Sequence, residues 1–303
     1  MHSELLWNLA AAGVVARCLH VVAELGAADH VESNAVPVAE LADACGAACD
    51  PLDRVLRLLT MHGVFEPTPT GYRHTAASAL LRTDHPASMR PFARMMGLPL
   101  VWNSLAELER SVRTGRSGSE PRGMSSYLRD ARVDVDAVLG ACDFHRFDTV
   151  ADVGGGRGHL LQAVLDAAPE AAGLLFELPA VIDALDIEHP RLTAVPGDFF
   201  VDALPAADAY LLVDVLDEWP DAECVAILSA IRRAARVGAT LLVIEDVPGE
   251  DQRAAALDVV RLAVTGGRER SPSDVDGLLR RSGFAVQQVV IAGTMHVVEA
   301  RAF

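Results

Sequence analysis

The stretch 149–161, near the middle of the chain, constrains the fold more than any other part of the sequence. Residues 149–153 (Thr-Val-Ala-Asp-Val) form a short apolar run typical of a buried strand, and residues 160–165 have the character of a helix. Four glycines lie between the two, at a strand-to-helix turn: Gly154, Gly155, Gly156 and Gly158. Glycine tolerates positive φ and lets a ligand approach the backbone closely, and the free N–H groups of a helix start favour electron-rich groups. The turn is therefore a candidate binding site for a nucleotide-like ligand.

An acidic residue stands where such a site needs one. Glu177 ends the next apolar run about twenty residues farther on, at the spacing expected of a carboxylate that binds ribose hydroxyls. The dinucleotide pattern G-x-G-x-x-G does not fit, because it requires a third glycine at His159 or Leu161. The sequence instead reads Asp-x-Gly-x-Gly-x-Gly from Asp152. A tight turn in an ordinary α/β domain is the alternative reading.

Length and composition limit the classes of protein. A chain of 303 residues is long enough for two domains, and we expect a division into residues 1–96 and 97–303. The formal charge of −16 argues against nucleic-acid binding, which needs clustered Lys and Arg. No stretch reaches the roughly twenty uninterrupted apolar residues of a membrane span, and the first residues lack the pattern of a signal peptide. We therefore expect a cytoplasmic protein that does not act at a membrane.

The first third of the chain reads as a helical lobe. Apolar residues recur at helical spacing over 5–24, a second helix is expected over 38–45, and Asp50 is expected to cap a third that Gly63 ends. Residues 64–66 and 72–74 around a Pro- and Gly-rich turn predict a small hairpin, which completes a winged-helix arrangement. Such a lobe either binds DNA, with Arg54, Arg57 and His62 on the reading helix, or mediates self-association. The acidic composition favours self-association.

Strands and helices alternate over the rest of the chain, after a polar connection at 113–123 and a helix over 133–142. The alternation predicts a doubly wound parallel sheet. Only three residues, Ala292 to Thr294, separate the last two strands, so these must form an antiparallel hairpin. The expected strands are Thr149–Val153, Gly173–Glu177, Leu192–Val195, Ala209–Val215, Thr240–Asp246, Phe284–Ile291 and Met295–Ala300.

Over nearly its whole length the chain resembles the homodimeric small-molecule O-methyltransferases of plant phenylpropanoid and bacterial polyketide pathways. The resemblance rests on the winged-helix lobe and on the segments 150–158, 176–179, 196–200 and 266–271. It implies a Rossmann-like class I methyltransferase fold, with a seven-stranded sheet whose last strand is antiparallel and an N-terminal winged-helix dimerisation domain. It also implies S-adenosylmethionine as cofactor, a small-molecule acceptor, and a homodimer formed through the N-terminal helices.

The resemblance assigns the cofactor to a set of residues. The glycine turn would hold the methionine part of the cofactor, and Glu177, where the family usually has Asp, would hold the ribose. Asp198 would bind the adenine amino group, with Phe199 packed on the ring. The full set implied for the cofactor is Asp152, Gly154, Gly155, Gly156, Gly158, Glu177, Leu178, Gly197, Asp198 and Phe199.

The catalytic residues match the family only in part. The family's base is a histidine in a Val-Leu-His-Asp-Trp motif, and two acids orient it. Glu245 and Glu269 match the two acids, but Asp217 stands where the histidine belongs. Asp214 and Arg261 place charge where the family's substrate wall is often neutral, and the connection at 113–123 looks shorter than the family's. We expect Asp217 to position the acceptor or to act as a weak base, with a pKa raised by burial and by neighbouring carboxylates.

Three hypotheses for the function remain open. The first is methylation of a hydroxyl or another nucleophile of a small natural product. The second is a methyltransferase fold repurposed for decarboxylation, hydroxylation or ring formation, and the third is a winged-helix regulator that senses a ligand. Asp217 and Glu218 also have a purely structural interpretation, as polar residues at the start of a helix that Asp221 caps. His145, His159 and His296 are candidates for a substitute base, although structural roles are more common at such positions.

Overall fold

The computed structural model describes residues 2–31, 34–117, 133–187, 189–249 and 251–303. Its contacts divide the chain into two compact units, Met1–Asn103 and Ser104–Phe303. Residues 118–123 of the polar connection expected from the sequence lie outside the described residues.

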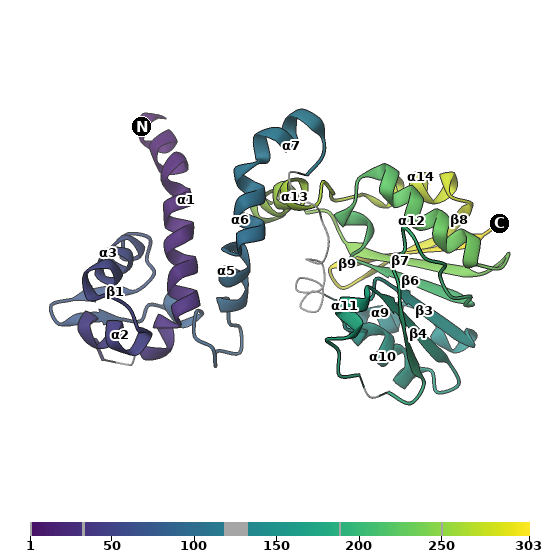
Figure 1. Ribbon diagram of the computed structural model, residues 1–303, viewed down its shortest axis with the longest axis horizontal. Helices are drawn as coiled ribbons and strands as arrows, with labels where there is room; N and C mark the ends of the chain where they lie inside the picture. Colours follow the sequence, from purple (N-terminus) through teal and green to yellow (C-terminus); the bar gives the residue numbers. More distant parts are fainter. Residues whose placement is uncertain (1, 32–33, 118–132, 188, 250) are drawn as a thin grey trace. The chain divides into compact units, whose positions relative to one another are not determined.

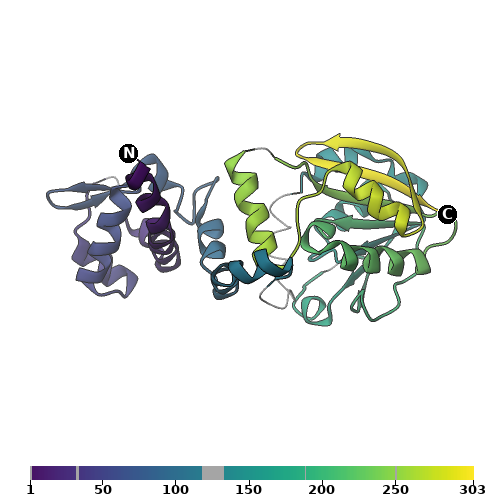
Figure 2. The same cartoon turned by 90° about the horizontal axis from the view of Figure 1, so that it is seen from above.

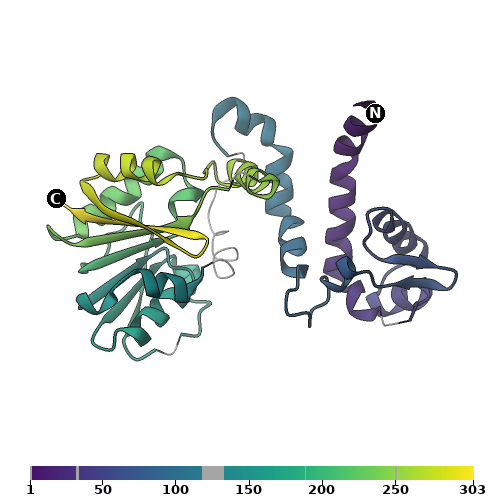
Figure 3. The same cartoon turned by 180° about the vertical axis from the view of Figure 1, so that it is seen from behind.

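The N-terminal unit is mostly helical and contains the expected hairpin. Its apolar core takes side chains from α1, α2, α3 and α5 and from the hairpin region, among them Leu41, Leu56 and Phe65. In Figure 3 the long helix α1, drawn in purple, runs beside α5. The elements are α1 (His2–Leu25), η1 (Ala27–His30), α2 (Val38–Cys45), α3 (Cys49–Thr60), β1 (Glu66–Thr68), β2 (Gly71–Arg73), α4 (Ala76–Ala79) and α5 (Arg90–Met96). α6 (Pro99–Ala106) spans the division between the units.

The start of α3 differs from the prediction. Ala48, not Asp50, is the N-cap, and Asp50 lies in the first turn of the helix. The helix begins earlier because Pro51 is tolerated anywhere in the first turn, where its missing N–H has no intrahelical partner to lose. α2 has the predicted bounds.

Helix α1 presents an apolar surface to solvent. Leu5, Leu6, Trp7, Leu9 and Val14 are each more than half exposed, whereas Val22 and Ala23 near its C-terminal end are buried. By length and composition alone, this helix could also cross a membrane. An exposed apolar face of this length usually marks a contact surface.

The C-terminal unit is a seven-stranded sheet between two layers of helices (Figure 1). The strand order is β5-β4-β3-β6-β7-β9-β8, with β3 to β7 parallel and β9 antiparallel to both neighbours. Figure 2 shows the β8–β9 hairpin in yellow at one edge of the sheet. The strands are β3 (Thr149–Val153), β4 (Ala172–Glu177), β5 (Leu192–Pro196), β6 (Ala209–Val213), β7 (Thr240–Asp246), β8 (Phe284–Ala292) and β9 (Met295–Ala302). The predicted fold class is confirmed.

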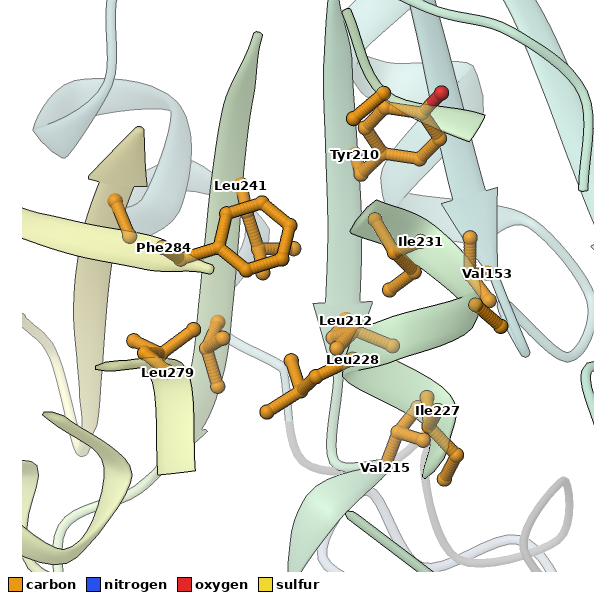
Figure 4. Close-up of a cluster of buried hydrophobic side chains, with 14 of the residues drawn as sticks. Val153, Tyr210, Leu212, Val215, Ile227, Leu228, Ile231, Leu241, Leu279 and Phe284 are labelled. Carbon is orange, nitrogen blue, oxygen red and sulfur yellow. The ribbon is translucent and has the colours of Figure 1, made fainter. Parts of the chain in front are cut away.

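Two apolar clusters fix the layers. The cluster in Figure 4 joins one face of the sheet to α12 and α14 through side chains such as Leu212, Ile231 and Leu279. The opposite face packs on α9 and α10. The remaining elements are α7 (Leu108–Thr114), α9 (Val135–Ala141), η2 (Phe144–Arg146), α10 (His159–Ala167), α11 (Pro179–Ile182), η3 (Leu216–Glu218), α12 (Asp221–Ala234), α13 (Gln252–Val264) and α14 (Pro272–Arg281).

β6 ends two residues earlier than predicted. Asp214 has φ of 48°, a left-handed conformation that a strand cannot contain. Its N–H still donates to the carbonyl of Ile244 on β7, at 2.9 Å. The chain therefore turns away from the sheet at Asp214. Because β3 to β7 are parallel, their C-terminal ends meet along one edge, where ligands bind in folds of this type.

Candidate functional site

The glycine turn after β3 has the conformation that its sequence requires. Gly154, Gly156 and Gly158 have φ of 69°, 58° and 70°, in the left-handed region that side chains rarely adopt. Gly155 is constrained by space instead, because a Cβ there would lie 2.3 Å from the carboxylate of Asp152. Gly158 is the N-cap of α10, so the helix start faces the turn.

Glu177, at the end of β4, is tied directly to this turn. Its Oε2 accepts a hydrogen bond from the N–H of Gly156 at 3.0 Å, and its Oε1 accepts one from the N–H of Leu178 at 2.7 Å. The carbonyl of Glu177 accepts from the N–H of Gly197, at 2.9 Å. A buried carboxylate held in this way has a fixed orientation beside the glycine turn.

The segment after β5 forms a tight turn that a side chain stabilises. Asp198 Oδ1 accepts a hydrogen bond from the N–H of Phe200 at 2.8 Å, which makes a tight turn. Phe199 is half-buried and meets Phe200 and Trp219 edge-on, with ring centroids 4.8 and 6.0 Å apart. The predicted cofactor residues thus come from the ends of β3, β4 and β5, three neighbouring strands of the sheet.

A pocket opens at the end of β3, beside the glycine turn. It is lined by Val133, Val135, Asp152, Gly155, His159, Leu160 and Val213. The lining combines a buried carboxylate with apolar side chains and exposes glycine backbone, a donor and acceptor set that fits a ligand with amino and hydroxyl groups and an apolar body. The residues present therefore fit S-adenosylmethionine.

Two of the three predicted catalytic acids, Asp217 after β6 and Glu245 near the end of β7, lie close together. Asp217 lies on η3, and its N–H donates to Oε1 of Glu245 at 3.1 Å. The side chain of Asp217 contacts a cation: Nε of Arg261 lies 2.8 Å from Asp217 Oδ2. Nη1 of the same guanidinium lies 2.9 Å from Oε1 of Glu269. Asp217, Arg261 and Glu269 therefore form one chain of ion pairs.

Burial strengthens these contacts. Asp217 is 6% exposed, Glu245 2% and Arg261 8%. Burial, and then the charges of Asp217 and Asp214, raise the pKa of Glu245 well above its usual range. Burial would lower the pKa of Arg261, but Asp217, Glu269 and Asp246 together raise it. Glu245, with its raised pKa, therefore lies beside the buried Asp217–Arg261 ion pair.

Two residues of the Gly-Gly-Arg-Glu-Arg segment (266–270), Gly267 and Arg270, hold η3 in place. Arg270 is fully buried and donates to the carbonyls of Leu216 and Trp219 and to the carboxylate of Asp221. The backbone of Gly267 lies directly against Asp217, since a Cβ there would be 2.1 Å from the Asp217 carbonyl oxygen. The segment therefore sets the position of Asp217 as well as supplying Glu269.

Sequence reasoning missed these supporting contacts. It noted Arg261 as a charge in the substrate wall but did not pair it with Asp217. The available signal was a single arginine inside the apolar run Val259 to Val264, where an unpaired cation is costly. Asp221 does not cap α12, because Pro220 is the N-cap and the Asp221 carboxylate binds Arg270 instead.

The three histidines that were candidates for a substitute base lie apart from one another. His145 lies on η2, and His159 lines the pocket at the start of α10. His296 is buried on β9 directly opposite Glu245 in the strand register, and burial lowers its pKa. Neither ring nitrogen of His296 has a hydrogen-bond partner among the described residues.

Comparisons with known proteins agree with this geometry. Residues 83–285 match the family model of the O-methyltransferase domain, and residues 7–84 match that of the O-methyltransferase dimerisation domain. The chain is 34% identical to a phenazine O-methyltransferase of Lysobacter antibioticus, over 99% of this chain and 96% of that protein. It is 32% identical to a solved mitomycin 7-O-methyltransferase, with a TM-score of 0.87 and coverage of 100% and 98%.

A third relative has been solved with ligands. It is an O-methyltransferase of neocarzinostatin biosynthesis in complex with S-adenosylmethionine and 2-hydroxy-5-methyl naphthoic acid, 30% identical, with a TM-score of 0.78 and coverage of 95% and 96%. Because these relatives are named as methyltransferases, the repurposed enzyme and the DNA-binding regulator are not favoured. The chain belongs to the O-methyltransferase family: it is an S-adenosylmethionine-dependent methyltransferase that carries the family's dimerisation domain.

Proposed function

We propose that the enzyme methylates a hydroxyl group on an aromatic ring of a small natural product, as a tailoring step of secondary metabolism in the cytoplasm. The names of its relatives support this acceptor class, since they include phenazine, mitomycin and naphthoate O-methyltransferases. The observation that carries the proposal is the buried pair of Asp217 and Glu245, placed at the same edge of the sheet as the glycine turn.

We assign the cofactor to the residues at the ends of β3, β4 and β5. Glu177, fixed by two backbone N–H groups, accepts hydrogen bonds from the ribose hydroxyls, with Leu178 beside it. Asp198 takes the adenine amino group, Gly197 leaves room for the base, and Phe199 packs on the ring. Asp152 and the turn Gly154, Gly155, Gly156 and Gly158 hold the methionine part. When bound, S-adenosylmethionine supplies a methyl group on a cationic sulfur, which is a good leaving group.

Asp217 acts on the acceptor. It accepts a hydrogen bond from the acceptor hydroxyl and so aligns the oxygen with the methyl carbon. As the acceptor oxygen takes the methyl group that bound S-adenosylmethionine would supply, the hydroxyl proton would pass to the Asp217 carboxylate. Oxygen becomes far more acidic as it acquires the methyl group, so a carboxylate suffices where the family uses an imidazole. Glu245 fixes the backbone of Asp217, and Glu269 fixes Arg261.

Methyl-labelled cofactor tests the reaction. We expect label to pass to members of a panel of hydroxylated naphthoates and phenazines, with one S-adenosylhomocysteine released for each product. Glu177→Ala should abolish cofactor binding in calorimetry. Turnover of an acceptor without label in the product, or wild-type protein with no affinity for the cofactor at millimolar concentration, would overturn the proposal.

We also propose that the enzyme is a homodimer joined through its N-terminal helices, with the boundary of this lobe at 96/97. The exposed apolar face of α1 supports the interface, and the matched dimerisation segment begins on the same helix. Light scattering should give twice the chain mass of 32.2 kDa. Leu5→Glu combined with Leu9→Glu should shift the mass toward the monomer, whereas a wild-type monomer at micromolar concentration would refute the interface.

A further inference from the structure

Arg261 has an unusually complete set of acidic neighbours. Its Nε contacts Asp217, its Nη1 contacts Glu269, and its Nη2 lies 3.9 Å from Oδ2 of Asp246. The planar guanidinium matches several carboxylates at fixed angles, which the point charge of a lysine cannot do. Both ends of the Asp217–Arg261 pair are more than nine-tenths buried, so the contact has little competition from water.

Glu269 fixes the position of Arg261 through two contacts with its helix. It lies on α13, and the N–H of Glu269 donates to Oδ1 of Asp258 on the same helix at 2.7 Å. Glu269 therefore binds α13 twice, through its backbone and through its carboxylate. These two contacts fix the position of the Arg261 guanidinium relative to η3.

Only one oxygen of Asp217 remains available. Oδ2 is occupied by Arg261, whereas Oδ1 is buried and has no hydrogen-bond partner among the described residues. A buried carboxylate oxygen without a donor is costly, so its retention indicates a ligand that supplies the donor.

We propose that Arg261 is a positioning residue of the acceptor site: it binds Oδ2 of Asp217 and is aligned by Glu269, so that Asp217 presents Oδ1 alone to the acceptor hydroxyl. The inference rests on the proposed function, and it makes Asp217 and Arg261 a single unit that replaces the histidine of the resembled family. Restoring that histidine by Asp217→His alone should therefore fail, because the imidazole would face the guanidinium. Asp217→His combined with Arg261→Met removes that cation and should turn over faster than Asp217→His alone.

A double-mutant cycle tests the pairing, with kcat and KM measured separately on 1,4-dihydroxy-2-naphthoic acid and on any better acceptor from the panel. Arg261→Met should lower kcat about tenfold or more, because a misplaced reacting group costs that much, with cofactor affinity unchanged. Arg261→Lys should recover part of the loss. After Asp217→Asn, the further change Arg261→Met should alter kcat by less than about threefold, since residues that act as one unit are not additive. Arg253→Met, on the exposed face of the same helix, is the matched control and should keep wild-type kcat.

Crystal structures with S-adenosylhomocysteine provide a readout that does not depend on turnover. The Asp217 carboxylate should keep its orientation in wild type and in Arg261→Lys and should rotate in Arg261→Met. An unmoved carboxylate in Arg261→Met, or losses of kcat that multiply in the double variant, would overturn the inference. A wild type that methylates no acceptor, but whose carboxylate still rotates in Arg261→Met, would refute the proposed function and leave the positioning role standing.

Discussion

Gly267 offers a way to move Asp217 without changing any polar side chain. Its backbone packs against η3: a Cβ would lie 2.1 Å from the Asp217 carbonyl oxygen and 2.5 and 2.7 Å from Glu218 backbone atoms. The conflict is with backbone on every side, so rotation of a side chain cannot relieve it. Gly267→Ala must displace either η3 or the segment that carries Glu269.

The size of the displacement sets the expected effect. Ordinary contacts of a Cβ begin at 3.4 Å, so the backbone must give by about 1.3 Å in a close-packed interior. A misplacement of about 1 Å at a reacting group lowers turnover by about 100-fold, which corresponds to about 2.7 kcal/mol of activation free energy. The glycine turn after β3 lies on a different strand, so cofactor binding should survive.

Labelled-cofactor turnover, calorimetry with S-adenosylhomocysteine and thermal melting together decide the matter. Gly267→Ala should lose about 100-fold in kcat and bind the cofactor product as wild type does. Gly277→Ala on α14 is the control, since nothing lies within 4 Å of its Cβ position; it should keep kcat and gain about 0.5–1 kcal/mol of stability. A Gly267→Ala enzyme with full kcat would show that the position of η3 does not govern the reaction.

Three further predictions follow from single side chains. Glu177→Gln should weaken cofactor binding about tenfold or more in calorimetry, because an amide cannot accept from the Gly156 N–H and from two hydroxyls in the same way; equal affinity would remove Glu177 from the site. Because burial raises the Glu245 pKa above its usual value of 4.5, the folded protein keeps a proton there that the unfolded chain has lost, and stability falls as pH rises from about 4.5 through the raised pKa. Glu245→Gln should therefore gain in Tm relative to wild type between pH 5 and pH 8, and a constant difference would contradict a raised pKa. Arg270→Met should cost about 3 kcal/mol in urea unfolding, since it leaves two buried carbonyls and Asp221 without their donor; a loss below about 1 kcal/mol would contradict this.

The sheet could be predicted from the sequence because each strand is a short apolar run bounded by a turn. All seven predicted strands exist, including the terminal hairpin that three intervening residues made necessary. The error at the end of β6 has a local cause. Val213 and Val215 extend the apolar run on either side of Asp214, but Asp214 adopts a positive φ, which its residue type alone does not predict.

The site was predictable where it depends on strand ends and not where it depends on packing between loops. Glu177 ends β4 and Glu245 is the last residue but one of β7, so their place at the carboxyl edge follows from the topology. The contact of Asp217 with Arg261 joins η3 to α13, and no periodicity relates the two segments. Such a contact depends on the path of the chain after β7, which sequence patterns do not determine.

The substitution at position 217 becomes intelligible only together with this contact. A histidine there would bring a second basic group to Arg261, whereas an aspartate neutralises the guanidinium and is held by it. The two acids that match those of the resembled family both contact the Asp217–Arg261 pair. Glu245 still fixes the backbone of residue 217, and Glu269 now orients the arginine that holds the side chain. Under the proposed function, the change from histidine to aspartate replaces the family's base with a weaker one that Arg261 holds in place. This exchange suits an acceptor whose hydroxyl loses its proton readily once it is aligned with the methyl group, and it is least suited to an aliphatic alcohol.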